Sequence, residues 1–494
     1  MGSWRRFAFF QQRELGQPSL FQAGVSACCG LDEGGLALAD VHGVVHLLDR
    51  GLTEWCAFGA HDKGVTQLAE CGGLLLTFGL EADGPAIRAC MRAWRPQGAG
   101  TGELQGTATC LRTLRIFGGP PEPSITCVAA SGGPSQIAIG LDDGQALLLR
   151  CAELLKDRFL KFKPLPSLAK HAGAGTEPVT AVHFAAADGE GVDGAGEAAH
   201  LFVARRDAIF SVTAAGLRGE SCAPLNEGAG ADAGLCCTSD RNDLVVGRPE
   251  AIYFYTADER GPCFAFGGEK YALCWHRSYL VVAAADGHGG APGPGAIGHA
   301  GGYDPSQQQQ QQQPVHVYDL KNKLIAHHTT VPSAVRWVIS SRLSVLIVCA
   351  DGRILSLEEH PLSTKLESLF RKSLYPTALS LAASQCFEPS VLGEIHLKYA
   401  EHLYGKGDYD GAVEHFVATI GHAEPSRAIR RSTPAMIRIR YLQSRASLFG
   451  IRLPHLAGSS RRSTFGTSQR TSPPCTPTAE ASPAESTPRC CSRA

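Results

Sequence analysis

The sequence contains no run of 18 or more apolar residues, so it predicts no transmembrane helix. Its first residues, MGSWRRFAFFQQRE, lack the apolar core and small-residue cleavage site of a signal peptide. Arg6 occupies the position where the N-myristoylation pattern requires Ser or Thr. The 18 Cys residues are scattered through this signal-less chain, which indicates reduced thiols in the cytosol.

The spacing of those Cys residues excludes the common zinc modules. No two of them are separated by two residues, so the paired ligands of a zinc ribbon or RING finger are absent. The adjacent pairs Cys28-Cys29, Cys236-Cys237 and Cys490-Cys491 are poorly shaped to chelate one metal together. We interpret them as buried or fortuitous thiols and expect no metal and no cofactor.

Catalytic motifs are also missing. The sequence has no phosphate-binding loop with Lys-Ser/Thr, no G-x-S-x-G and no His-Glu-x-x-His. The glycines of GPGAIG (293–298) imitate a dinucleotide fingerprint, but Pro294 occupies the turn and no helix pattern follows. His42 and His61 lie in turns between β-type runs, where we expect them to hold local hydrogen bonds. The sequence therefore favours a protein that is not an enzyme, with no catalytic residues.

Length and composition set the scale of the fold. A chain of 494 residues with 44% hydrophobic residues predicts two or three domains. The net charge of −1 argues against bulk binding of nucleic acid or of an anionic membrane, although local charged patches can still exist.

Seven pairs of β-type runs recur before residue 360, each joined by a polar or Gly-containing turn. At roughly 50 residues a unit, this period is typical of four-stranded propeller blades. The turns at Asp143-Gly144 and Asp351-Gly352 are favourable for tight hairpins. The paired runs are residues 36–49, 74–94, 137–150, 201–212, 244–255, 280–287 with 315–320, and 345–359.

The sequence therefore predicts an all-β seven-bladed propeller of the WD type over residues 1–360. Two stretches, 186–198 and 287–314, are rich in Gly or Gln and predict disordered surface insertions. We expect the segment 4–10 to add the outer strand to the last blade and close the ring.

After Pro361 the hydrophobic period changes to that of helices. Runs at 364–372 and 373–387 precede a break at 388–390, and the stretch KYAEHLYGKGDYDGAVEHFVATIG (398–421) reads as a helix–turn–helix. Gly405 and Gly407 are expected to supply the left-handed turn, and Asp408 to cap the second helix. We predict that residues 361–431 begin an α-solenoid with an exposed apolar end. Candidate partner-binding residues are Tyr399, Leu403, Tyr404, Asp408, Tyr409, Val413 and Phe416.

The composition changes again near Arg427. Residues 427–494 contain 12 Arg, no Lys and 2 acidic residues, a net charge of +10. We expect a disordered basic tail over 432–494, rich in Ser, Pro and Arg. Two interpretations remain: a regulatory or anchoring tail, and, as the favoured one, an altered reading frame or splice product.

Several distinctive segments occur together and in order, from Trp4 to about Arg431. In them the chain resembles the family of vacuolar protein sorting-associated protein 11, class C subunits shared by the HOPS and CORVET tethering complexes. The segments are WRRFAFF (4–10), CLRTLRIF (110–117), IAIGLDDGQALLLR (137–150), LVVGRPEAIYFYTADERGPCFAFGGEK (244–270), VYDLKNKLIAH (317–327), TKLESLFRKSLYPTALSLAASQ (364–385), the stretch 398–421 and EPSRAIRR (424–431).

The resemblance implies a seven-bladed propeller, a clathrin-repeat-like α-solenoid and a C-terminal RING finger associated with ubiquitin-ligase activity. It implies a scaffold that joins other class C subunits at late endosomes, lysosomes and vacuoles, and works with Rab GTPases and SNAREs in membrane fusion. The distal solenoid and the RING cysteines are missing here, so we expect a chain truncated before them and no ligase activity. A coat-like scaffold and a ubiquitin-ligase subunit without its RING region are the alternatives.

Overall fold

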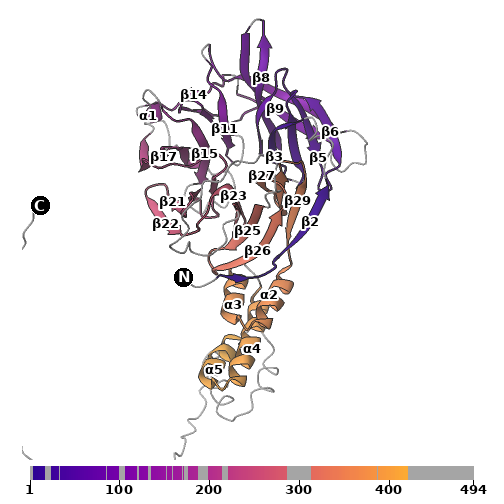
Figure 1. Ribbon diagram of the computed structural model, residues 1–494, viewed down its shortest axis with the longest axis vertical. Helices are drawn as coiled ribbons and strands as arrows, with labels where there is room; N and C mark the ends of the chain where they lie inside the picture. The colour runs from indigo at the N-terminus through magenta and orange to yellow at the C-terminus, as the bar shows by residue number, and fades with distance from the viewer. Residues whose placement is uncertain are drawn as a thin grey trace, which may run out of the picture.

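A ring of seven β-sheets carries a short column of helices on one side (Figure 1). The computed structural model describes residues 4–16, 24–32, 34–84, 86–98, 106–119, 122–131, 135–151, 153–157, 159–169, 171, 176–186, 198–213, 221–285, 313–385 and 388–420. The predicted insertions, apart from the strand residues at their ends, and the predicted basic tail lie outside these residues.

Each sheet is one blade, and strands that follow one another along the chain pair in antiparallel order. The strands of the first three blades are β3 (Val25–Gly30), β4 (Leu36–Asp40), β5 (Val44–Leu48), β6 (Glu54–Gly59); β7 (Val65–Cys71), β8 (Leu74–Asp83), β9 (Ala86–Gln97), β10 (Thr107–Arg115); and β11 (Ile125–Ala130), β12 (Gln136–Leu141), β13 (Ala146–Arg150), β14 (Lys163–Pro164). A short helix, α1 (Pro166–Ala169), follows β14.

The remaining four blades repeat this arrangement. Their strands are β15 (Val179–Ala186), β16 (Ala198–Arg205), β17 (Ala208–Thr213), β18 (Cys222–Glu227); β19 (Cys236–Thr238), β20 (Leu244–Gly247), β21 (Ile252–Tyr255), β22 (Arg260–Phe264); β23 (Lys270–His276), β24 (Tyr279–Ala284), β25 (Gln313–Asp319), β26 (Leu324–Val331); and β27 (Val335–Ser340), β28 (Ser344–Cys349), β29 (Ile354–Glu359). The first strands of successive blades contact one another around the ring, and β27 meets β3 to close it.

The seven predicted pairs of runs are confirmed as the two central strands of each blade. Many of the residues in these strands are buried, because neighbouring blades cover both faces of each strand. In β12 and β28, for example, every residue is buried.

The ring closes through the N-terminal segment, although the predicted residues are only partly right. β2 (Phe10–Gly16) pairs with β29 and supplies the fourth strand of the last blade. The earlier residues instead form β1 (Arg5–Arg6), which pairs in parallel with β26 of the sixth blade. The segment 4–10 therefore joins two blades, and the closing strand begins where the prediction ended.

Two residues of the predicted Gln-rich insertion, Gln313 and Pro314, belong to the sheet. Gln313 is the first residue of β25 and is buried, and its Oε1 accepts a hydrogen bond from the Val335 amide at 2.8 Å. The prediction of an insertion reaching residue 314 is therefore wrong at its C-terminal end, because a buried glutamine side chain can be satisfied by a backbone donor.

His61 holds local structure, as expected. Its ring is buried, its Nε2 shares a hydrogen bond with Thr77 Oγ1 at 2.8 Å, and the indole of Trp94 donates to the same oxygen at 3.0 Å. Burial lowers the pKa of His61 to about 4. Gly79 is required beside it, since an added Cβ would lie 2.5 Å from the imidazole. His42 is exposed, and its amide donates to Asp40.

In the described residues after the last blade there are four helices: α2 (Leu362–Arg371), α3 (Tyr375–Ser384), α4 (Pro389–Gly405) and α5 (Tyr409–Ala418). Asp408 caps α5 as predicted, accepting a hydrogen bond from the Gly411 amide at 3.0 Å. Of the two glycines expected in the turn, Gly407 has a positive φ of 85°, whereas Gly405 is the last helical residue of α4.

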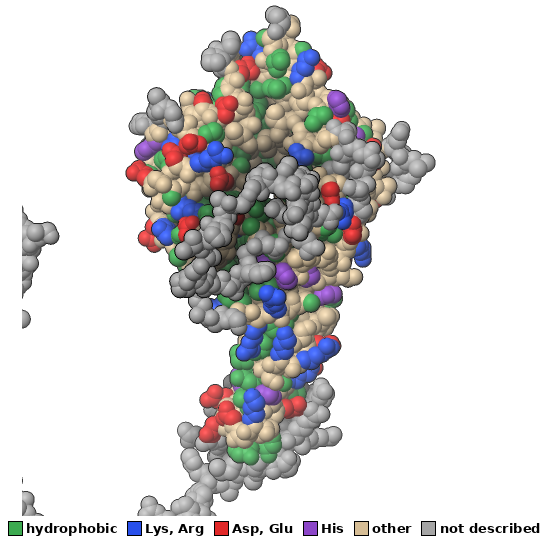
Figure 2. Space-filling model, viewed as in Figure 1, with side chains coloured by type: hydrophobic (Ala, Val, Ile, Leu, Met, Phe, Trp, Pro, Cys, Tyr) green, Lys and Arg blue, Asp and Glu red, His purple; other side chains and the backbone are tan. Residues whose placement is uncertain are grey.

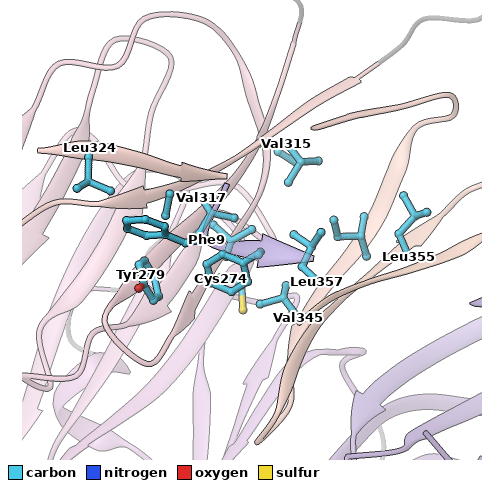
Figure 3. Packing of buried hydrophobic residues seen from close by; sticks show 14 of the residues in the cluster. Phe9, Cys274, Tyr279, Val315, Val317, Leu324, Val345, Leu355 and Leu357 are labelled. Atoms are coloured by element: carbon cyan, nitrogen blue, oxygen red, sulfur yellow. The ribbon is translucent and has the colours of Figure 1, made fainter. Parts of the chain in front are cut away.

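The propeller and the first helices share one hydrophobic core. Phe9 packs among side chains of β24, β25, β28 and β29, as Figure 3 shows. The same cluster continues into Leu366 and Leu369 of α2, Leu381 of α3 and Ile395 of α4. The helices are therefore anchored to the sixth and seventh blades by continuous packing.

Candidate partner-binding surface

A buried ion pair fixes the start of the helices to the propeller. Lys365 of α2 and Glu359 of β29 have side chains only 2% and 6% exposed, and their Nζ and Oε1 atoms lie 2.6 Å apart. Arg277 contacts the other carboxylate oxygen at 2.7 Å, and Gln385 at the end of α3 lies 3.4 Å from both partners of the pair. Burial acts to raise the pKa of Glu359, but Lys365, with Tyr279 and Arg277, holds it below its ordinary value.

Aromatic rings then connect the four helices. Phe370 of α2 stacks on Tyr375 of α3, with 5.5 Å between the ring centroids, and Tyr375 stacks on Tyr399 of α4, with 5.1 Å between the centroids. Tyr399 in turn contacts His415 of α5 at 4.2 Å, and the Nδ1 atoms of His415 and His396 lie 3.0 Å apart. We call Phe370, Tyr375, Tyr399 and His415 the aromatic ladder. Tyr399, a candidate binding residue, therefore has a structural contact on both faces.

Three more of the candidate residues also stabilise the α4–α5 pair. Val413 is 9% exposed and Phe416 is 2% exposed, and both pack against Leu397 and Ala400 of α4. Asp408 is exposed but acts as the helix cap. A partner could reach Val413 and Phe416 only if the two helices separated.

The remaining candidates, Leu403, Tyr404 and Tyr409, form what we call the tyrosine surface. Leu403 and Tyr404 are half-buried, and Tyr404 meets the ring of Tyr409 edge-on at 5.2 Å. Tyr409 itself is 52% exposed.

Exposed acidic side chains lie close to Tyr409 in the sequence, as does the exposed Lys406. Asp408, Asp410 and Glu414 are all exposed near Tyr409 on α5. Figure 2 shows Asp and Glu gathered at this end of the helices, whereas Lys and Arg gather nearer the propeller. A complementary partner would present an apolar patch with basic groups around it.

Sequence reasoning missed the aromatic ladder and the buried ion pair. The ladder depends on contacts between four helices, which hydrophobic periodicity along one helix does not reveal. Lys365 stands in a helical run where a lysine normally faces solvent. The only available signal was its place on the same helical face as Leu362, Leu366 and Leu369.

Two absences concern the part of the chain that the structure describes. No helix in this part is long and apolar enough to cross a bilayer. Nor does it bring together three His, Cys, Asp or Glu side chains able to hold a metal ion.

Comparisons with known proteins agree with one another. A family model described as PEP5/VPS11 N-terminal matches residues 4–359. A vacuolar protein sorting-associated protein 11 homolog from Dictyostelium discoideum is 31% identical over 455 residues, covering 87% of this chain and 45% of the relative. The homolog from Homo sapiens is 29% identical over 449 residues, with the same coverage. The homolog from Arabidopsis thaliana is 30% identical over 440 residues, covering 86% and 42%. The chain thus spans less than half the length of these relatives.

Proposed function

The chain belongs to the vacuolar protein sorting-associated protein 11 family, and from this membership we propose that it is a non-enzymatic scaffold subunit of a HOPS/CORVET-type tethering complex. Its partners would be other class C vacuolar protein sorting subunits, and through them Rab GTPases and SNAREs. It would work on the cytoplasmic face of late endosomes, lysosomes or vacuoles, in vesicle transport and membrane fusion.

The observation that carries the proposal is the rigid attachment of a helical column to a propeller of this family. The shared core and the buried Lys365–Glu359 pair make the two parts one body, so a force or partner acting on the helices is transmitted to the propeller. Such platforms act by holding several partners at once, without covalent chemistry.

We assign the contact with a class C partner to the tyrosine surface. A half-exposed Tyr next to another aromatic ring is the kind of residue that dominates binding energy at protein interfaces. Val413 and Phe416 support this surface from beneath by fixing α5 against α4.

Affinity capture tests both parts of the proposal. The tagged chain should recover class C subunits, identified by mass spectrometry. The variant Tyr409→Asp should lower their recovery by about tenfold or more, because it removes an interface aromatic and adds charge to an acidic region. Tyr271→Asp is a matched control, since Tyr271 is 41% exposed on the propeller strand β23.

The outcomes are separable. Recovery of no class C subunit by the unmodified chain would overturn the tethering function. Recovery that is equal for the unmodified chain and Tyr409→Asp would leave the scaffold in place but overturn the tyrosine surface as its contact.

A further inference from the structure

The most exposed large apolar side chain in the described part of the chain is Phe159, which is 95% exposed. It lies in the connection between β13 and β14 of the third blade, and Figure 1 shows β14 far from α2–α5. Leu155, in the same connection, is 37% exposed. Neither residue belongs to the tyrosine surface or to the aromatic ladder.

The residues around Phe159 alternate between exposed and more buried side chains. Leu160 and Phe162 pack against the core of the second and third blades. Phe159, Lys161 and Lys163 are all exposed. Because Leu160 and Phe162 face the core between them, the aromatic ring and the two ammonium groups lie on the exposed side of the segment. Exposure to water is expected for the two lysines, but it is unfavourable for the phenylalanine ring.

The connection is held in shape from below. Leu154 is 1% exposed and Phe162 is 9% exposed, and both belong to the same core cluster. The amides of Lys156 and Asp157 both donate to the Glu153 carbonyl, at 3.2 and 3.0 Å. Phe159 therefore lies between two residues, Leu154 and Phe162, that pack into the core.

The charge of this region is positive. Residues 150–163 contain five basic and two acidic residues. One acid, Glu153, is paired with Lys156 at 2.6 Å, and the other, Asp157, accepts a hydrogen bond from the Glu153 amide. On the adjacent strand β10, Arg112 donates to the Leu155 carbonyl at 3.5 Å. Both acids of the loop thus have partners within it, and Lys161 and Lys163 are exposed close to Phe159 in the sequence.

We propose that this loop is a membrane-contact site, in which Phe159 inserts into the interfacial region of an anionic lipid bilayer while Lys161 and Lys163 bind lipid phosphates. Aromatic side chains favour the headgroup level of a bilayer, and basic residues are attracted to an anionic leaflet. The inference needs no tethering partner, so it stands or falls separately from the proposed function.

The geometry favours a bilayer over a protein as the occupant. A side chain with almost its whole surface in water projects from a convex surface, and a deformable lipid interface accepts such a projection without a matching pocket. The site also lies on the opposite side of the ring from the helices (Figure 1). A bilayer bound there leaves the tyrosine surface free.

The test uses the full chain and vesicles of phosphatidylcholine with or without 30% phosphatidylserine. Because the residues from Arg427 onward carry a charge of +10, simple co-flotation would not locate the contact. The variant Phe159→Trp places a reporter in the loop, and Ile87→Trp places one at a matched apolar position, 56% exposed on β9. Brominated lipid quenches only an inserted indole.

We expect anionic brominated vesicles to quench the added fluorescence of Phe159→Trp and not that of Ile87→Trp. Combining Phe159→Trp with Lys161→Glu and Lys163→Glu should weaken the quenching by roughly tenfold or more, whereas Lys321→Glu with Lys406→Glu, at exposed sites elsewhere, should not.

Three results would overturn the proposal. The first is equal quenching at positions 87 and 159, and the second is vesicle binding without quenching at position 159. The third is an emission shift of Phe159→Trp with soluble polyglutamate but not with vesicles, which would identify an acidic protein as the occupant.

Discussion

The variant Lys365→Met tests whether the buried ion pair joins the helices to the propeller. It removes the ammonium 2.6 Å from Glu359 and leaves that carboxylate, 6% exposed, with Arg277 as its remaining charged partner. Breaking a buried pair from one side costs about 3–5 kcal/mol. Since Arg277 is half-exposed and stays in place, we expect the low end, about 3 kcal/mol.

Thermal unfolding at pH 7 provides the assay. At about 2 cal/mol/K of unfolding entropy per residue, 3 kcal/mol corresponds to a fall in Tm of roughly 4 °C for the described part of the chain. Limited proteolysis should also cleave α2 and α3 sooner. Arg371→Met, on the exposed face of α2, is the matched control and should change stability by less than about 0.5 kcal/mol.

The double variant Glu359→Gln/Lys365→Met decides the cause. Because Glu359→Gln removes the carboxylate that Lys365→Met leaves unpaired, the double variant should regain at least half of the lost free energy of unfolding. If the double variant is as unstable as the sum of the two single variants, packing and not charge explains the loss, and the reasoning is refuted.

Three further perturbations follow from local geometry. Asp408→Ala removes the cap of α5 and should destabilise it by about 1 kcal/mol, measured by helical circular dichroism; Asp408→Ser should restore most of this. Gly79→Ala forces a Cβ into His61 and should lower Tm by several degrees, with Gly59→Ala as a milder control without a neighbouring atom. The free energy of unfolding should fall as the pH is lowered from 6.5 to 4. In this range the imidazoles of the unfolded chain bind protons, whereas the buried imidazoles of the folded chain stay neutral. The loss is at most about 2 kcal/mol for each group at pH 5. Burial lowers the pKa of four to about 4: His61, His183, His276 and His316.

The propeller was predictable because its signal is local and repeated. Each blade places two apolar runs around a tight turn, and the runs remain recognisable even where the fourth strand is short, as in β14. Ring closure was harder, because the pairing of Phe10–Gly16 with β29 joins the two ends of the propeller sequence. The expectation that segment 4–10 closes the ring came from the architecture and not from periodicity, and this segment shares only Phe10 with the closing strand.

In the helices, the local features could be predicted from the sequence, but the contacts between helices could not. Asp408 and Gly407 could be placed because caps and left-handed turns have local residue preferences. The sequence did not reveal which of the seven candidate binding residues are buried and which are exposed. Phe416 and Tyr409 are both aromatic residues of one helical run, and only the position of α4 decides that the first is buried and the second exposed.

The most direct test of the central claim is the composition of the complex that the chain forms. The tagged chain, co-expressed with class C vacuolar protein sorting subunits, should elute from gel filtration together with at least one of them in a constant molar ratio. Tyr409→Asp should shift the chain to its monomer position, and Tyr271→Asp should not. If the unmodified chain elutes alone whenever those subunits are folded and present, it is not a scaffold of this kind.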